Sequence, residues 1–341
     1  MSRVVVRGTG AVSPAGWGVA PLRAAVEQGQ PLPLKEVDRP GWKKPLLART
    51  VPLPSPRPAF LGHARLRRTS PISHYAVAAA LEALGDDAPK VTEGSLRLGL
   101  VLCAMSGCVN YSRRFYDEAL RDPATASPLV FPETVFNAPS SHLAALLGTP
   151  AVNYTLVGDP GTFLQGMALA AQWLSEGLVD GCLVVGSEEM DWLTADAFRL
   201  FTRKLVLSDG AGALYLRTDG AAGRGVELAA VTDSHLFRDR NSRVTAAKLV
   251  ARQLCQNATG SFLCDGRQGV AMLDCAEEHA WSGWAGQFLS PKKVVGEGLM
   301  AGAAWQCVLA VDVLNRGLVN EAMVSVAGCN QQVIGARFKA Y

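Results

Sequence analysis

The feature that most constrains the fold of this chain is a helical segment that is apolar on almost every side. Residues 163–176 place apolar side chains around nearly the whole helical circumference, and Gly177 stands where a glycine ends many helices. Such a helix cannot lie at a surface, because each of its faces needs a covering layer. The sequence therefore predicts a fold of several layers with this helix in the middle.

Short apolar strands alternate with helices along the rest of the chain. Helical spacing of small residues predicts helices over 73–84 and 301–314. Strands are predicted at residues 4–6, 98–103, 182–185, 211–216, 226–231 and 323–326. This alternation, in two successive sets, predicts a layered α/β fold. With 341 residues, 49% of them hydrophobic, the chain can bury a large core.

Two local features concern loops. Gly8-Thr9-Gly10 follows the first strand, but a third glycine and a following helix are missing, so a tight turn is predicted in preference to a dinucleotide-binding loop. Eight of the 19 prolines fall within residues 31–58, which predicts an extended surface excursion. The basic cluster after it is interpreted as a solvated loop face rather than a docking patch; its residues are Arg65, Arg67 and Arg68.

The composition limits the kinds of partner and ligand to be expected for this chain. A net charge of +3 gives no reason to expect nucleic acid, and the apolar stretches are too short to cross a membrane. The eight cysteines form no C-x-x-C pair, which predicts reduced thiols in the cytoplasm. Four residues invite a zinc hypothesis, but their spacing matches no common finger; they are Cys255, Cys264, Cys275 and His279. We therefore expect no metal and no cofactor.

Several motifs follow one another in a recognisable order along nearly the whole chain. They are residues 6–16, Ser73-His74-Tyr75-Ala76, Asp209-Gly210-Ala211-Gly212-Ala213-Leu214 and Gly328-Cys329-Asn330. The chain thereby resembles the β-ketoacyl-acyl-carrier-protein synthases of the condensing-enzyme (thiolase-fold) superfamily. The resemblance implies a thiolase-like fold of two pseudo-duplicated α/β halves in αβαβα layers. It places the first half at 1–225 and a compressed second half at 226–341.

The residues that would carry the family's chemistry are missing. Family members have a cysteine at the start of the central helix, where a thiolate can accept an acyl group, and two histidines that bind the thioester carbonyl. The matching positions are Pro160, or Asp159 after a slip of one residue, then Asp265 or Gly266, and finally Glu297, with Lys292 at the family's lysine. The resemblance thus implies a scaffold without condensing activity.

Other side chains are candidates for substrate contact or altered chemistry. The resemblance places Cys108 and Phe163 by the substrate, and Val326 where the family has its acyl-gating phenylalanine. Cys108 is also the best candidate for a relocated nucleophile, with small apolar packing as the alternative. Asp265 and Glu297 are a further hypothesis, in which two carboxylates meet and one has a raised pKa.

Three short motifs have simpler interpretations. Asp159 is predicted to cap the central helix, with Pro160 as its first helical residue. Ser141 and His142 are neighbours on a helix and so cannot face each other as a dyad. The adjacent Glu188-Glu189 follow a strand and are interpreted as a solvated turn.

The resemblance implies a catalytically deficient ketosynthase-like subunit, similar in role to chain-length factors. Such a subunit would act with an active ketosynthase, as a heterodimer or otherwise as a homodimer, and with an acyl carrier protein in fatty acid or polyketide biosynthesis. Two alternatives stay open. One is a divergent acyl-carrier or acyl-coenzyme A transferase or hydrolase with relocated catalytic residues. The other is a non-catalytic protein that binds acyl carrier.

Overall fold

The computed structural model describes residues 3–150, 152–219, 225–255 and 260–341. Each strand predicted from the sequence is present, in several cases longer than predicted. The strands are β1 (Arg3–Ser13), β2 (Gly16–Trp17), β3 (Lys35–Val37), β4 (Leu46–Ala48), β5 (Leu98–Ala104), β6 (Asn153–Val157), β7 (Gly181–Glu188), β8 (Gly210–Asp219), β9 (Val226–Val231), β10 (His235–Leu236), β11 (Phe262–Cys264), β12 (Gln287–Leu289), β13 (Glu321–Ala327) and β14 (Gln332–Ala340).

The three predicted helices are also present, as α2, α6 and α11. The α-helices are α1 (Val19–Gln28), α2 (Pro71–Leu84), α3 (Ala88–Thr92), α4 (Val109–Arg121), α5 (Ala138–Leu147), α6 (Thr162–Ser175), α7 (Trp192–Arg199), α8 (Arg240–Leu254), α9 (Ala271–Ala280), α10 (Pro291–Val295) and α11 (Met300–Asn315). Short 3-10 turns are η1 (Ala59–Gly62), η2 (Ala64–Leu66), η3 (Gly85–Asp87) and η4 (Phe131–Glu133).

One pairing pattern occurs twice in the main sheet. Among the described residues the sheet has the order β12-β11-β13-β14-β9-β1-β8-β7-β5-β6. In the first set β5 is parallel to β6 and β7, and β8 is antiparallel to β7 and β1. In the second set β11 is parallel to β12 and β13, and β14 is antiparallel to β13 and β9. The chain therefore has the predicted pseudo-duplicated α/β architecture.

The two sets meet where β1 pairs with β9, through Val5 opposite Glu227 and Val6 opposite Val226. The second set begins with β9, which is also where the second half is predicted to begin. Residues 220–224, at the end of the predicted first half, lie outside the described residues, as do 1–2, 151 and 256–259.

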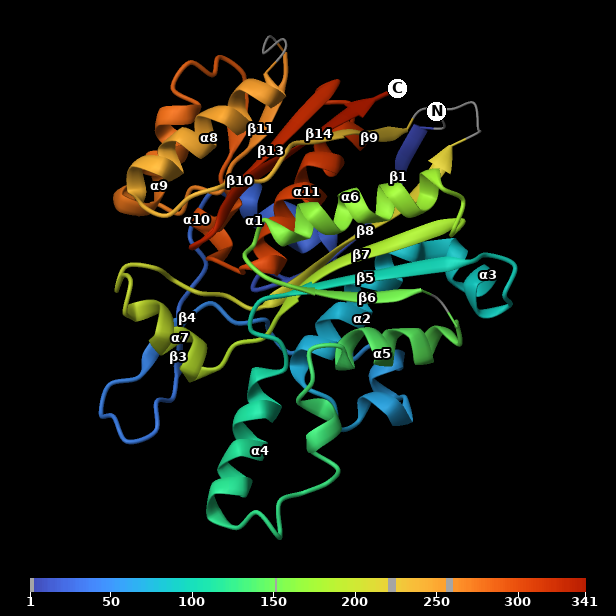
Figure 1. Cartoon of the computed structure of the whole chain (residues 1–341), viewed down its shortest axis with the longest axis vertical. Helices are drawn as coiled ribbons and strands as arrows, with labels where there is room; N and C mark the ends of the chain where they lie inside the picture. The colour runs from blue at the N-terminus through green and yellow to red at the C-terminus, as the bar shows by residue number, and fades with distance from the viewer. Residues whose placement is uncertain (1–2, 151, 220–224, 256–259) are drawn as a thin grey trace.

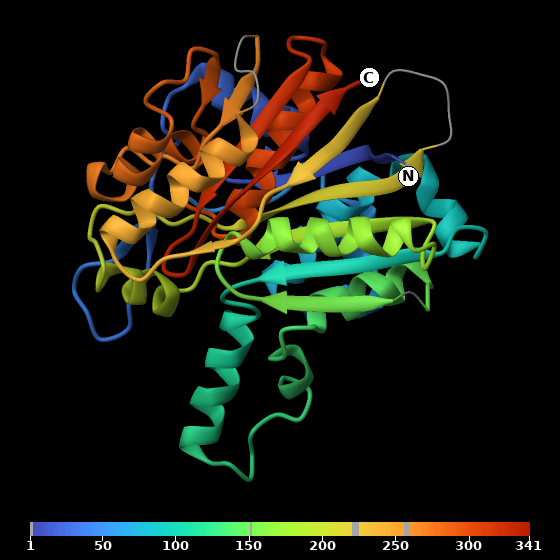
Figure 2. The ribbon, with the colours of Figure 1, turned by 45° about the horizontal axis from the view of Figure 1, so that its top comes forward.

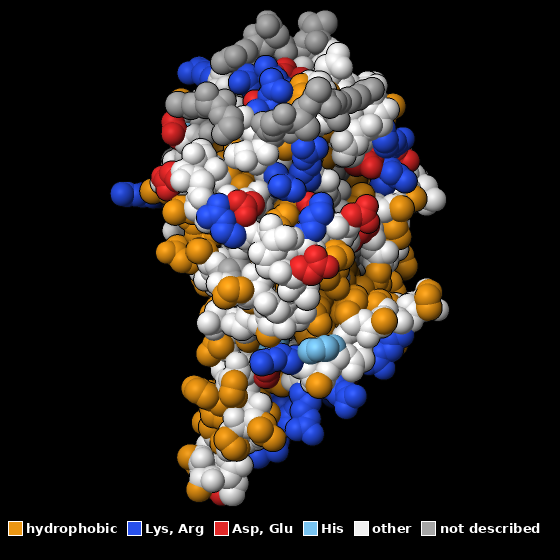
Figure 3. All heavy atoms as spheres, turned by 90° about the vertical axis from the view of Figure 1, so that its right-hand side faces the viewer, with side chains coloured by type: hydrophobic (Ala, Val, Ile, Leu, Met, Phe, Trp, Pro, Cys, Tyr) orange, Lys and Arg blue, Asp and Glu red, His pale blue; other side chains and the backbone are white. Residues whose placement is uncertain are grey.

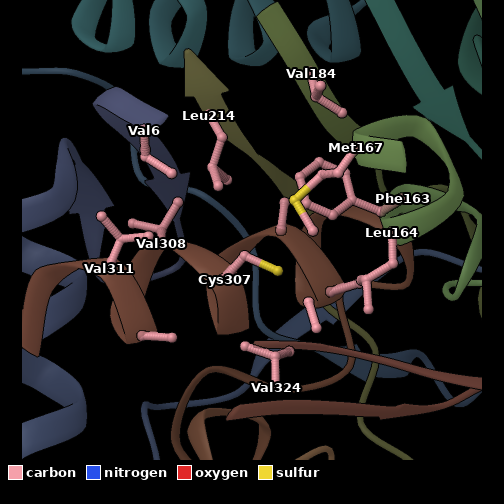
Figure 4. Close-up of a cluster of buried hydrophobic side chains, with 14 of the residues drawn as sticks. Val6, Phe163, Leu164, Met167, Val184, Leu214, Cys307, Val308, Val311 and Val324 are labelled. Atoms are coloured by element: carbon pink, nitrogen blue, oxygen red, sulfur yellow. The ribbon is translucent and has the colours of Figure 1, made fainter. Parts of the chain in front are cut away.

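Helices α6 and α11 form the middle layer, since each contacts strands of both sets, while α2 and α5 cover one outer face and α8 and α9 the other (Figure 1). Their side chains meet in a core to which both sets contribute (Figure 4). Phe163, Met167 and Cys307 are fully buried there. Helix α6 is thus buried on the side that carries Phe163, Met167 and Ala170, but Gln165, Ala168 and Gln172 on its other side are exposed, so the prediction that this helix is covered on every side is wrong for that face.

The Gly8-Thr9-Gly10 motif does not form the predicted tight turn. Strand β1 continues through it to Ser13, with only a register shift between Val6 and Gly8. A Cβ atom at Gly10 would lie 1.9 Å from the carbonyl oxygen of Ala79 in α2. The glycines are therefore needed because the α2 backbone packs directly on β1.

The proline-rich excursion is more structured than predicted. Strands β3 and β4 form an antiparallel pair within it, and Leu46 and Ala48 of β4 are buried. Its return to the body is fixed because the buried carboxylate of Asp209 accepts a hydrogen bond from the backbone amide of Val51 at 2.7 Å.

A projecting arm, residues 109–137, has no counterpart among the predicted elements. It consists of α4, a loop and η4, and it extends away from the body (Figure 2). Helix α4 has no buried residue, although its sequence is strongly amphipathic. In Figure 3 hydrophobic side chains are gathered on the lower projection of the molecule. An exposed apolar surface of this kind is typical of an interaction site.

Candidate functional site

The amino end of α6 is the place where the sequence resemblance puts the nucleophile. Helix α6 begins at Thr162, and its N-cap residue is Gly161, with no side-chain hydrogen bond to the helix end. The predicted capping role of Asp159 is therefore wrong, and Pro160 precedes the helix instead of being its first residue. Neither side chain can form a thioester.

The side chain of Asp159 is instead directed at the turn between β13 and β14. Its carboxylate is buried and accepts three backbone hydrogen bonds, from Cys329 at 2.8 Å, Gln331 at 2.9 Å and Gln332 at 3.1 Å. A Cβ atom at Gly328 would lie 2.1 Å from this carboxylate, so the turn needs glycine there. Asp159 thus joins the start of the central helix to the second half of the chain.

Glu297, at the position of the second histidine, is a buried hydrogen-bond acceptor. Its Oε2 lies 2.8 Å from Nζ of Lys292 and accepts a hydrogen bond from Nε2 of Gln268 at 2.7 Å. Its Oε1 accepts the backbone amide of Leu299 at 2.8 Å. Burial opposes the charged form of Lys292, but the neighbouring Glu297 carboxylate raises the pKa of Lys292 overall. The Glu297 carboxylate itself has no N–H group to donate to a carbonyl.

Asp265 and Glu297 do not form the carboxylate pair considered from the sequence. Asp265 accepts from Nε of Arg267 at 2.8 Å, whereas Glu297 is paired with Lys292. A different carboxylate is close to Asp265. Burial, with a smaller contribution from Asp265, raises the pKa of Glu277 to about 7, and its oxygens accept the backbone amide of Gly266 at 3.0 and 3.2 Å.

The predicted substrate-contact residues are all buried, in different surroundings. Phe163 and Val326 belong to the main hydrophobic core. Cys108 packs with Ile72, Ala104 and Ala138 in a small cluster at the base of the arm. Burial, together with the nearby Glu189 carboxylate, raises the pKa of the Cys108 thiol. A thiol in this state is a poor nucleophile at neutral pH.

Six further thiols also have a raised pKa. Burial raises the pKa of Cys103, Cys182, Cys255, Cys264, Cys307 and Cys329. Cys275 Sγ lies 3.4 Å from Nδ1 of His279, one helical turn away on α9. Within the part of the chain that the structure describes, no group of three or more His, Cys, Asp or Glu side chains is arranged to hold a metal ion.

Ser141 and His142 lie on α5, as expected for neighbours that do not face each other. His142 Nε2 is 2.8 Å from Glu133 Oε2 in η4, so this histidine ties the returning side of the arm to the body.

Glu188 and Glu189 are not a solvated turn, because both are buried. Glu188 accepts the backbone amides of Met105 at 2.5 Å and Ser106 at 3.0 Å, and burial raises its pKa to about 8. Glu189 accepts the amide of Asn110, at the start of α4, at 2.8 Å. The two carboxylates therefore hold the base of the arm. Their role was missed because a charged pair after a strand is usually solvated.

A hollow of about 300 Å³ opens beside the amino end of α6, lined by Met105, Val157, Gly158, Asp159, Asn330 and Gln331. Its wall thus combines the ends of β5 and β6 with the β13–β14 turn. Arg243 of α8, which the sequence gave no reason to single out, holds the other side of that turn. Its Nη2 donates to the carbonyls of Ala327 at 3.1 Å and Gly328 at 2.9 Å.

The fold and the pairing pattern define a thiolase-like α/β protein. The family profile described as "Beta-ketoacyl synthase, N-terminal domain" matches residues 1–223. The chain belongs to the β-ketoacyl synthase family. A search of curated proteins found no match.

Solved structures with this fold include complexes of ketosynthases. "The ishigamide ketosynthase/chain length factor" superposes with a TM-score of 0.81 at 19% identity, covering 99% of each chain. A type II polyketide acyl-carrier protein in complex with its ketosynthase, AntDE:AntF, gives 0.78 at 19% identity and 100% of both chains. The ketosynthase ApeO with its chain length factor ApeC from Xenorhabdus doucetiae gives 0.79 at 14% identity, covering 100% of this chain and 98% of that one.

Proposed function

We propose that this chain is a catalytically deficient ketosynthase-like subunit that acts with an active ketosynthase and an acyl carrier protein in polyketide or fatty acid biosynthesis. One observation carries the proposal. Asp159, beside the position of the family's nucleophile, is fully used in holding the β13–β14 turn, and burial raises the pKa of Cys329, the thiol in that turn. The role is similar to that of chain-length factors, which appear in two of the similar structures.

The partner ketosynthase would bind at the β6 edge and the arm. Strand β6 is the last strand of the main sheet, so one side of its backbone is free to pair. Exposed apolar side chains accompany it on both the strand and the arm: Tyr116, Leu120, Leu129, Phe131, Val152, Tyr154 and Val157. An interface of this composition supports a lasting heterodimer, in which the arm would help to shape the partner's acyl tunnel.

The acyl carrier protein would dock on a basic surface of the chain. Residues 39–81 contain eight Lys or Arg and no Asp or Glu, although the net charge of the whole protein is only +3. Its exposed members include Arg57, Arg65, Arg67 and Arg68, for which the described residues show no ion pair. A carrier with an acidic face would be attracted to such a surface. This supports a docking role for the cluster that the sequence suggested was merely solvated.

The first test is intact-protein mass spectrometry after incubation with acyl- and malonyl-loaded carrier or coenzyme A. We expect no covalent adduct, while an active ketosynthase treated in parallel becomes acylated. A stoichiometric adduct that disappears in Cys108→Ser would establish the altered enzyme instead.

The second test is the composition of the assembly. The tagged chain, expressed in its native cells, should co-purify with a ketosynthase that has the complete Cys-His-His set, and the two purified chains should form a stable complex. Binding of carrier without any ketosynthase partner would favour the non-catalytic carrier-binding protein.

A further inference from the structure

The β13–β14 turn is held from two sides by opposite charges. Asp159 Oδ1 accepts the N–H of Cys329, and Arg243 Nη2 donates to the C=O of Gly328. These two groups belong to the same peptide unit. A peptide dipole with a carboxylate at its N–H and a guanidinium at its C=O forms two charge-assisted hydrogen bonds that polarise each other.

Further contacts fix the same turn. Asp159 Oδ2 accepts the amides of Gln331 and Gln332, and Nη1 of Arg243 donates to the carbonyl of Leu273 in α9 at 3.3 Å. The turn is thus tied to α6 by Asp159 and to the α8–α9 layer by Arg243. Glycine at 328 lets the Asp159 carboxylate approach the backbone.

We propose that Asp159 and Arg243 form a clamp that immobilises the β13–β14 turn over the amino end of α6. Asn330 and Gln331 of this turn form part of the wall of the 300 Å³ hollow. The clamp therefore keeps the hollow at a fixed size, and the turn does not move aside to admit an acyl group into this subunit. Both are positioning residues. The inference concerns the isolated chain and stands independently of the proposed partner.

Hydrogen exchange measures the clamp directly. In the wild-type protein the amides of Cys329, Gln331 and Gln332 should exchange as slowly as those of β13, although they lie in a turn. In Asp159→Asn an amide N–H₂ replaces one acceptor oxygen, so we expect at least one of these amides to exchange about tenfold faster or more. Asp180→Asn, which alters the exposed ion pair with Arg97, is the matched control and should leave the turn unchanged.

Alkylation of Cys329 by iodoacetamide, mapped by peptide mass spectrometry, provides a second readout. Arg243→Met and Asp159→Asn should each raise the rate at which Cys329 is alkylated. In the double variant the increase in this rate should be smaller than the product of the two single fold-changes, because both side chains act on one peptide unit. If Asp159→Asn does not fold, the clamp is tested by the exchange rates of the turn amides in the wild-type protein and by the alkylation rate of Cys329 in Arg243→Met. Rapid exchange of the wild-type turn amides, or unchanged rates in Arg243→Met, would overturn the clamp.

Discussion

At the scale of single residues, the positions that the sequence resemblance matches to the family's catalytic set make structural contacts. Asp159 holds a turn and Glu297 is neutralised by Lys292, so each buried charge has a defined partner. Buried charges persist only when they are paired or hydrogen-bonded.

Glu188 provides a pH-dependent test at this scale. Burial raises its pKa to about 8, so the folded protein keeps a proton that the unfolded chain releases above about pH 4.5. The free energy of unfolding should therefore fall as pH rises from 5 to 8, by up to about 1.4 kcal/mol per pH unit from this group.

Denaturant unfolding of Glu188→Gln should show a flatter dependence than wild type across this interval. Glu278→Gln, at an exposed glutamate, should retain the wild-type slope. If the free energy of unfolding changes with pH in the same way for wild type and Glu188→Gln, the raised pKa of Glu188 is contradicted.

At the scale of elements, the fold depends on how closely α2 packs on β1. The glycines of Gly8-Thr9-Gly10 are explained by this contact, which no turn or ligand-binding role would require. The sequence pattern alone could not reveal it, because the approach involves residues about 70 positions apart.

Gly10→Ala tests the packing of these two elements. Its new Cβ atom would overlap the Ala79 carbonyl oxygen at 1.9 Å, so we expect a loss of about 3 kcal/mol or more in the free energy of unfolding. Gly62→Ala is the matched control, since a Cβ atom there would meet nothing within 4 Å. Equal stability of the two variants in urea unfolding would show that α2 can move away from β1.

At the scale of the whole molecule, the arm and the β6 edge expose a group of apolar side chains. No helix among the described residues has the length and hydropathy to cross a membrane. Separately, the exposed apolar side chains of the arm are typical of an interaction surface.

Tyr116→Glu combined with Leu120→Glu tests this surface. Because these side chains are 62% and 67% exposed, the variant should keep the stability of the isolated chain but lose the complex with the ketosynthase. Leu318→Glu, at a residue that is 57% exposed on the loop after α11, should leave the complex intact. Size-exclusion chromatography of the two mixed chains, with thermal unfolding of each variant, distinguishes these outcomes.

The sequence determined the layered α/β class, because a mostly apolar helix must be packed against other elements and short apolar strands must pair. Motif order identified the family, and the absent cysteine and histidines were visible directly. The tertiary structure decided what replaced them. Asp159 acts on a turn 170 residues away, Arg243 reaches it from another layer, and Glu188 is buried by segments distant in sequence. The local sequence pattern determines the secondary structure and which apolar side chains are buried. The partner of a buried polar group, in contrast, depends on which distant segments the fold brings together.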